Sequence, residues 1–181
     1  AFLSPSIFYK TPIFPLVRSQ KLTLSIIKVY VSIMVENYNL NAKKSEGNNQ
    51  IENSDDGTYN VILRPDRTNR KRTPLHELCL SKSIGTDVLL YVLNHANVPH
   101  RHQAVKSFFY KCDAHGSTAF ELMCANEHAV SNEFLNTLLN RLAPLVSYKI
   151  QRHDLNALCK NHRLSSEMLE TVLSSCKPVA D

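Results

Sequence analysis

Thr73-Pro74-Leu75-His76-Glu77-Leu78-Cys79 is the stretch that decides the fold, because it recurs twice in altered form. The second copy is Thr118-Ala119-Phe120-Glu121-Leu122-Met123-Cys124, and the third is His153-Asp154-Leu155-Asn156-Ala157-Leu158-Cys159. Each copy is followed by a second apolar stretch, and these stretches end at Leu93, Leu139 and Leu173. An internal repeat of this kind indicates tandem units that bury their apolar faces by stacking on one another.

The spacing within each copy predicts two short helices. The cysteines of successive copies are 45 and 35 residues apart, but a leucine follows each cysteine after only 10 or 11 residues, at Leu89, Leu135 and Leu169. The second stretch of the first copy places apolar residues at i, i+1, i+4 and i+5, which is a helical period. In the first stretch, Thr73 is expected to cap the helix, and Pro74 fits the first turn, where its missing N–H costs nothing.

Two motifs resemble the ankyrin repeat. Thr73-Pro74-Leu75-His76 is similar to the start of the helix-turn-helix unit of that family, and Asp113-Ala114-His115-Gly116-Ser117-Thr118 is similar to its turn. The resemblance covers about residues 66–178 and implies an all-α, ankyrin-like stack of about three repeats at 73–98, 113–145 and 152–178. It also implies a turn conformation at Gly116 that other residues adopt with difficulty, and a His76 ring that bonds the backbone.

The same resemblance implies a function, which is non-catalytic protein binding as a scaffold or adaptor through loop tips and the concave helical face. Three departures keep an irregular helical bundle open as the alternative. Leu78 occupies a small-residue position of the family motif, and the third copy lacks Thr, Pro and Gly at the family's positions. The first spacing also exceeds the family period of about 33 residues by roughly a dozen.

The extra residues of the first spacing are expected in a loop around 99–111. Loops carry function because they vary without disturbing the stack, and adjacent aromatic residues are frequent interface anchors. For Phe108 and Phe109, filling the gap made by the insertion is an equally weighted alternative. The expected contacts of a partner protein in this loop and the next connection are His100, Arg101, His102, Phe108, Phe109, Tyr110, Tyr148, Lys149, Gln151 and Arg152.

The basic character of the chain is concentrated just before the first copy. Residues 64–72 contain Arg64, Arg67, Arg70, Lys71 and Arg72 against one Asp, whereas residues 73–181 contain ten basic and ten acidic residues. The cluster suggests nuclear import or phosphate binding, and a solvated basic linker is the simpler interpretation. The alternative function is therefore a nuclear regulatory protein whose basic arm contacts nucleic acid.

The five cysteines are residues 79, 112, 124, 159 and 176. At least three of them lie on predicted core faces, which favours a reduced, intracellular protein, cytoplasmic or nuclear. The Cys112/His115 and Cys124/His128 spacing resembles a zinc motif, but the repeat directs Cys124 into the core. No local signature of a nucleophile, a phosphate loop or a paired-carboxylate site is present. The sequence therefore predicts no enzyme activity, no cofactor and no metal.

The region before residue 64 is expected to lie outside the stack. Residues 1–35 contain no acidic residue. Because Lys28 interrupts their apolar run, neither a signal peptide nor a membrane span is expected. Because Met34 is the first Met, residues 1–33 are expected either to lie outside the natural protein or to belong to a longer protein of which this chain is a truncated part. Residues 36–63 are polar and expected to be disordered, with 59–63 covering the first repeat.

Overall fold

The computed structural model describes residues 71–82, 85–95, 101–128 and 130–175, together with residues 23–30 and positions 15, 17 and 32. Among these residues every regular element is helical and no strand is present, so the protein is all-α, as predicted. Within the same residues, no helix has the length and apolar character needed to cross a bilayer.

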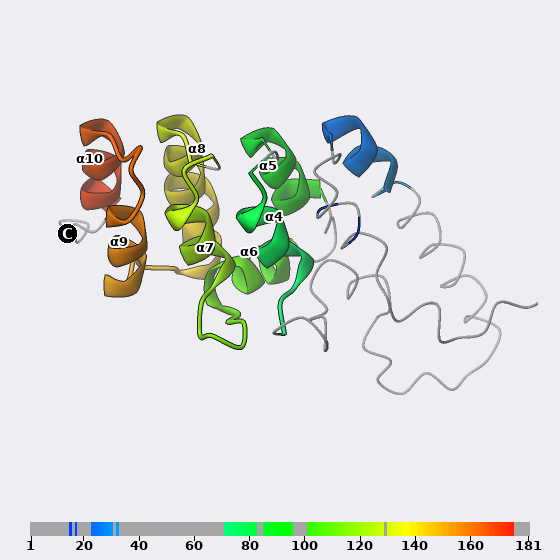
Figure 1. Ribbon diagram of the computed structural model, residues 1–181, viewed down its shortest axis with the longest axis horizontal. Helices are drawn as coiled ribbons and strands as arrows, with labels where there is room; N and C mark the ends of the chain where they lie inside the picture. The colour runs from blue at the N-terminus through cyan, green and yellow to red at the C-terminus, as the bar shows by residue number, and fades with distance from the viewer. Residues whose placement is uncertain are drawn as a thin grey trace, which may run out of the picture.

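The helices lie in two rows (Figure 1). One row holds α4 (Pro74–Leu80), α7 (Ala119–Ala125) and α9 (Arg152–Cys159), and α7 packs on both of its neighbours. The other row holds α5 (Thr86–His95), α8 (Asn132–Thr137) and α10 (Ser166–Ser175), with α10 packed on α8. The helix α8 continues as a π-helical turn, η2 (Leu138–Leu142), and a 3-10 turn, η3 (Ala143–Val146).

The helices of the first row begin in a common way. In each, the third helical residue accepts a hydrogen bond from the backbone N–H of the residue before the helix, at 3.1, 2.6 and 2.7 Å for His76, Glu121 and Asp154. The α7 start is a reciprocal capping box, because Thr118 Oγ1 also accepts from the Glu121 amide at 3.1 Å. These contacts satisfy N–H groups that the first turn of a helix leaves unpaired.

Most of the predicted core is buried, and the third copy departs from it only in part, because Leu158, Met168 and Val172 are buried as expected. The residues expected in the apolar stripes of the first two copies have at most 5% exposure (Leu75, Leu78, Val88, Leu89, Val92, Leu93, Phe120, Met123, Phe134, Leu135, Leu138 and Leu139). Cys79 and Cys124 are buried at equivalent places in α4 and α7, but Cys159 is exposed. Its predicted core position is wrong, because α9 is the last helix of its row in the described residues. Leu173 is also 48% exposed.

The insertion between the first two copies is a helix and not a loop. Residues 101–110 form α6 (Arg101–Tyr110), which packs on α5, α7 and η3. Its buried side chains are Ala104, Val105, Phe108 and Phe109, spaced at i, i+1, i+4 and i+5. The same residues have a helical period in the sequence, so the predicted loop at 99–111 is wrong over residues 101–110.

The turn before α7 has the geometry that its sequence predicts. Gly116 has a φ of +80°, a left-handed conformation that residues with a Cβ rarely adopt. The Asp113 carboxylate accepts hydrogen bonds from the amides of His115 at 2.8 Å and Ser117 at 3.1 Å. An isolated antiparallel bridge between Cys112 and Thr118 closes the turn.

Two asparagines join neighbouring helices of the first row. Asn126, which follows α7, donates from Nδ2 to the carbonyl oxygens of Cys79 at 2.7 Å and Ser81 at 3.0 Å, at the end of α4. Asn161, which follows α9, donates to the carbonyl oxygen of Cys124 at 3.0 Å, at the end of α7. The bonds to Cys79 and Cys124 satisfy carbonyl groups that the last turns of α4 and α7 leave without helical partners.

A short helical stretch at 24–30 packs beside the first helices (Figure 1, blue). Ile27 in this stretch is fully buried, and the Lys28 ammonium lies 5.7 Å from the centre of the Tyr91 ring of α5. The expectation that residues 59–63 cover the first repeat and the predicted disorder of residues 36–63 lie outside the described residues.

Candidate binding surface

An aromatic cluster fixes the inserted helix to the rest of the protein. Phe109 stacks on Tyr148 with ring centroids 4.3 Å apart, and it also contacts Phe108 at 5.1 Å and Phe120 at 5.0 Å. Phe108 and Phe109 have at most 1% exposure, and Tyr148 has 8%. The three residues, considered above as partner contacts, are therefore corrected to core positions. For the phenylalanine pair, the alternative that they fill the gap is confirmed.

The opposite face of α6 is exposed. His102, Lys106 and Tyr110 follow one another at intervals of four residues, so they lie along one side of the helix. Tyr110 is 47% exposed, and its ring packs edge-on against Tyr148 at 5.2 Å. Because the buried side of α6 is held by the aromatic cluster, this exposed side is a preorganised surface.

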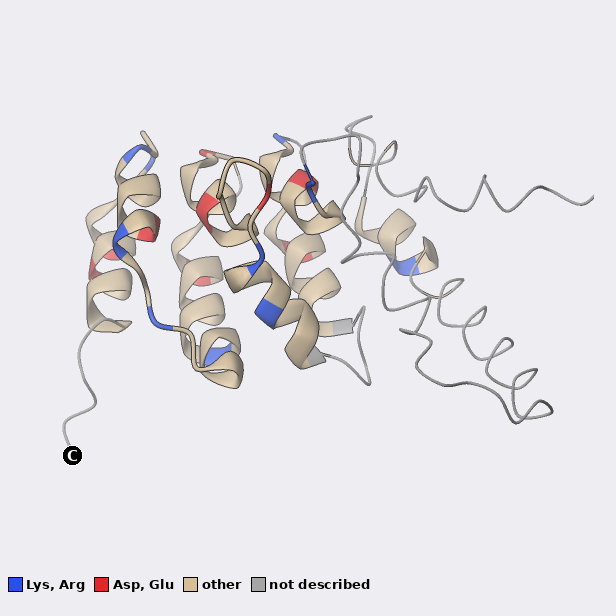
Figure 2. Ribbon diagram, turned by 90° about the horizontal axis from the view of Figure 1, so that it is seen from below, with Lys and Arg blue, Asp and Glu red and all other residues tan. Residues whose placement is uncertain are grey.

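The connection from η3 to α9 extends this surface (Figure 2). The Tyr110 hydroxyl donates to the carbonyl oxygens of Val146 at 3.4 Å and Ser147 at 3.5 Å, so α6 and the connection lie side by side. Ser147 has a φ of +53°, which turns the chain toward α9. Beyond it, Lys149 and Arg152 are exposed.

We call the exposed residues of α6 and this connection the basic surface; they are His102, Lys106, Tyr110, Lys149 and Arg152. The two segments that carry it, residues 101–112 and 143–153, contain five Lys or Arg and no Asp or Glu. The whole region 73–181 is formally neutral, so the positive charge on this surface is local. Such a surface attracts an acidic partner and steers its approach.

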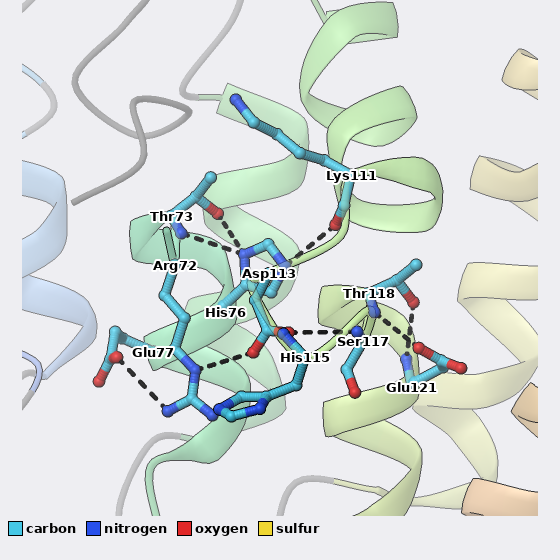
Figure 3. Close-up of polar contacts among 10 residues, drawn as sticks. All are labelled: Arg72, Thr73, His76, Glu77, Lys111, Asp113, His115, Ser117, Thr118 and Glu121. Atoms are coloured by element: carbon cyan, nitrogen blue, oxygen red, sulfur yellow. Dashed lines mark hydrogen bonds and ion pairs between the residues drawn. The ribbon is translucent and has the colours of Figure 1, made fainter. Parts of the chain in front are cut away.

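A buried polar network lies next to the turn before α7 (Figure 3). Arg72 donates from Nε to Asp113 at 3.0 Å and lies 3.8 Å from Glu77. Burial would raise the pKa of Asp113, but the bonds from Arg72 and from the amides of His115 and Ser117 outweigh it and hold the pKa below its ordinary value. Arg72, predicted as part of a phosphate-binding or import segment, is therefore engaged within the fold.

His76 links α4 to the end of α6. Its Nδ1 accepts from the Thr73 amide, so Nε2 carries the proton and donates to the Lys111 carbonyl oxygen at 3.0 Å. Burial lowers the pKa of His76, despite the opposing attraction of Asp113. The expected backbone bonding of this ring is confirmed.

The other predicted site residues fall in several places. Lys71 is exposed and has a φ of +55°. Arg101 begins α6, but its side chain lies outside the described residues. The remaining predicted residues also lie outside them, namely Arg64, Arg67, Arg70 and His100.

A second polar cluster lies between α7 and α9, and no sequence motif predicts it. His153 Nε2 lies 3.6 Å from Glu121 Oε1 and 3.8 Å from Asp154 Oδ1. The Tyr148 hydroxyl and the Gln151 amide both donate to Asp154 Oδ2. Burial raises the pKa of Asp154 above its ordinary value, and it also raises the pKa of Tyr148. Spacing could not predict the cluster, because Glu121 and His153 are far apart in the sequence.

The zinc-like Cys–His spacing does not form a cluster. Within the described residues, Glu121, His153 and Asp154 are the one group of three His, Cys, Asp or Glu that lies close enough to hold a metal ion. Burial raises the pKa of Cys124 well above its ordinary value, so this thiol stays protonated and is a poor metal ligand.

No protein-family model, curated protein or solved structure matches this chain.

Proposed function

We propose that this chain is a non-catalytic protein-binding module, an ankyrin-like stack of helix pairs that engages its partner through the basic surface. The resemblance in the Thr73–His76 and Asp113–Thr118 motifs supports the stack. The asparagine bonds from Asn126 and Asn161 add support, because both residues follow the copy's cysteine by two positions and both bind the preceding helix of the row.

The observation that carries the binding role is the juxtaposition of the exposed side of α6 with the connection to α9. An exposed tyrosine flanked by Lys and Arg combines an aromatic contact with charge, and Tyr and Arg are enriched at protein interfaces. The helix beneath is held by buried rings, so little conformational entropy is lost when a partner binds. A partner with an acidic surface matches this chemistry best.

Affinity capture with charge-reversal variants tests the proposal. The full chain and the double variant Lys106→Glu/Lys149→Glu are used as baits, with nuclease treatment of the lysate. A partner that binds the basic surface is retained by the wild-type chain and lost from the variant. Equal retention by both would rule out this surface.

The matched control is Lys160→Glu/Arg163→Glu, which changes the charge equally. Lys160 and Arg163 are exposed beyond the end of α9, whereas Arg152 lies at its start. The eight residues of α9 separate its two ends by about 12 Å along the helix axis. The control is expected to retain the partner. If nuclease treatment alone removes everything bound, the alternative of a nucleic-acid-contacting regulator is favoured instead.

A further inference from the structure

Three potential metal ligands converge between α7 and α9. The ligand atoms offered by Glu121, His153 and Asp154 all lie within 4.8 Å of one another. The imidazole nitrogen is 3.6 Å and 3.8 Å from the two carboxylate oxygens. Ligands of a tetrahedral zinc ion, bonded at about 2.1 Å, are about 3.4 Å apart, so small side-chain movements would complete the geometry.

Asp154 supplies an independent sign of a missing ligand. The residue is only 2% exposed, yet its Oδ1 atom has no hydrogen-bond partner, although this atom faces the imidazole of His153. A buried carboxylate oxygen without a partner is costly and rare in native proteins. A cation between Asp154, His153 and Glu121 would satisfy it.

The surrounding groups already orient both carboxylates. Thr118 donates its amide to Glu121 Oε2, which leaves Oε1 on the side of His153. Tyr148 and Gln151 donate to Asp154 Oδ2, which leaves Oδ1 directed into the cluster. Outer hydrogen bonds of this kind fix the ligands of metal sites and set their affinity.

We propose that Glu121, His153 and Asp154 bind one zinc ion, an activity that goes beyond the protein-binding role and departs from the metal-free expectation of the sequence. An imidazole with two carboxylates suits zinc, whereas Mg²⁺ and Ca²⁺ prefer oxygen ligands throughout. The two carboxylates neutralise the ion. The His153 side chain is 55% exposed, so the open side of the ion would carry water.

Isothermal titration of the reduced 181-residue chain with zinc chloride tests the site. The wild-type chain is expected to bind one zinc ion, and His153→Ala is expected to weaken binding about tenfold or more. This variant removes an exposed ring, and circular dichroism checks that it folds. Glu121→Gln keeps the capping bond to Thr118, because Gln also serves at this position, and it should weaken binding similarly.

His162→Ala is the matched control, since it removes another exposed imidazole, beyond the end of α9, and should bind zinc like the wild-type chain. Cobalt(II) spectroscopy distinguishes metal binding by the cysteines from binding by this site. Thiolate ligands give intense charge-transfer absorption, whereas nitrogen and oxygen ligands give weak bands. Weak bands that disappear in His153→Ala are expected. No stoichiometric zinc binding, unchanged binding by His153→Ala, or a thiolate spectrum would each overturn the proposal.

Discussion

Asn161 donates its side-chain amide to the carbonyl oxygen of Cys124 at 3.0 Å, and this buried bond ties the turn after α9 to the end of α7. Asn126 makes the corresponding bond to Cys79 at 2.7 Å, one helix earlier in the row. Each asparagine also shapes its own turn, because its Oδ1 accepts from the amide two residues later, in His128 and Arg163.

Asn161→Ala is predicted to destabilise the protein by about 1–3 kcal/mol, because it leaves the buried carbonyl of Cys124 without this partner. Urea unfolding measures the change. Asn156→Ala, an exposed position on α9, is the control and should alter stability by less than about 0.5 kcal/mol. Equal effects of the two substitutions would show that the bond does not join α9 to α7.

The aromatic cluster makes opposite predictions for two adjacent residues. Phe109→Ala should cost about 3–5 kcal/mol, since it opens a cavity among Phe108, Phe120 and Tyr148. Tyr110→Ala should cost much less, because its ring is half exposed, but it should weaken partner binding. Thermal unfolding and affinity capture separate the two effects. A stable Phe109→Ala chain would contradict the placement of α6.

His76 predicts a pH dependence of stability. Burial lowers its pKa from an ordinary value of about 6.5, so the unfolded chain binds more protons than the folded chain just below that pH. Its contribution is therefore complete above about pH 6.5 and is lost as the pH falls through the folded pKa.

The control for this effect is His76→Gln, which can still accept the Thr73 amide but does not titrate. The variant should be less stable at pH 7, because the bond to the Lys111 carbonyl is lost. Its stability should then fall less steeply than that of the wild-type chain between pH 7 and 5. Parallel pH profiles in urea unfolding would assign the acid sensitivity to other groups.

Arg72 and Lys71 are predicted to behave differently although both belong to the basic segment. Arg72→Gln should cost about 1.5–3 kcal/mol, because the buried Asp113 carboxylate loses a charged hydrogen bond. Lys71→Gln should be nearly neutral, since Lys71 is exposed. A localisation test of the segment must therefore keep Arg72 and replace Lys71 together with the basic residues that precede it. Otherwise unfolding will be mistaken for loss of import.

The sequence predicted the all-α fold and the first two helix pairs because their apolar periods and caps are local signals. Leu89 and Leu135 are buried, and Gly116 adopts its left-handed conformation, as expected. The prediction failed for α6, because aromatic residues in an insertion suit both a surface loop and a buried helix. Only the tertiary contacts with Tyr148 distinguish these two cases.

The third copy and the polar clusters were harder to predict. Cys159 follows the repeat in sequence but is exposed, because burial depends on the neighbouring helix and not on the residue itself. Asn126 and Asn161 did carry a signal, since both follow a repeat cysteine by two positions. The meeting of Glu121 with His153 depends on how α7 and α9 pack, which no local pattern encodes.

Hydrogen-exchange mass spectrometry of the nuclease-treated complex tests the binding role most directly. A partner on the basic surface should slow amide exchange in peptides that cover residues 101–112 and 146–153, and should leave peptides around 160–167 unchanged. Protection confined to residues 160–167, at the other end of α9, or no protection of α6 in a saturated complex, would contradict binding through this surface.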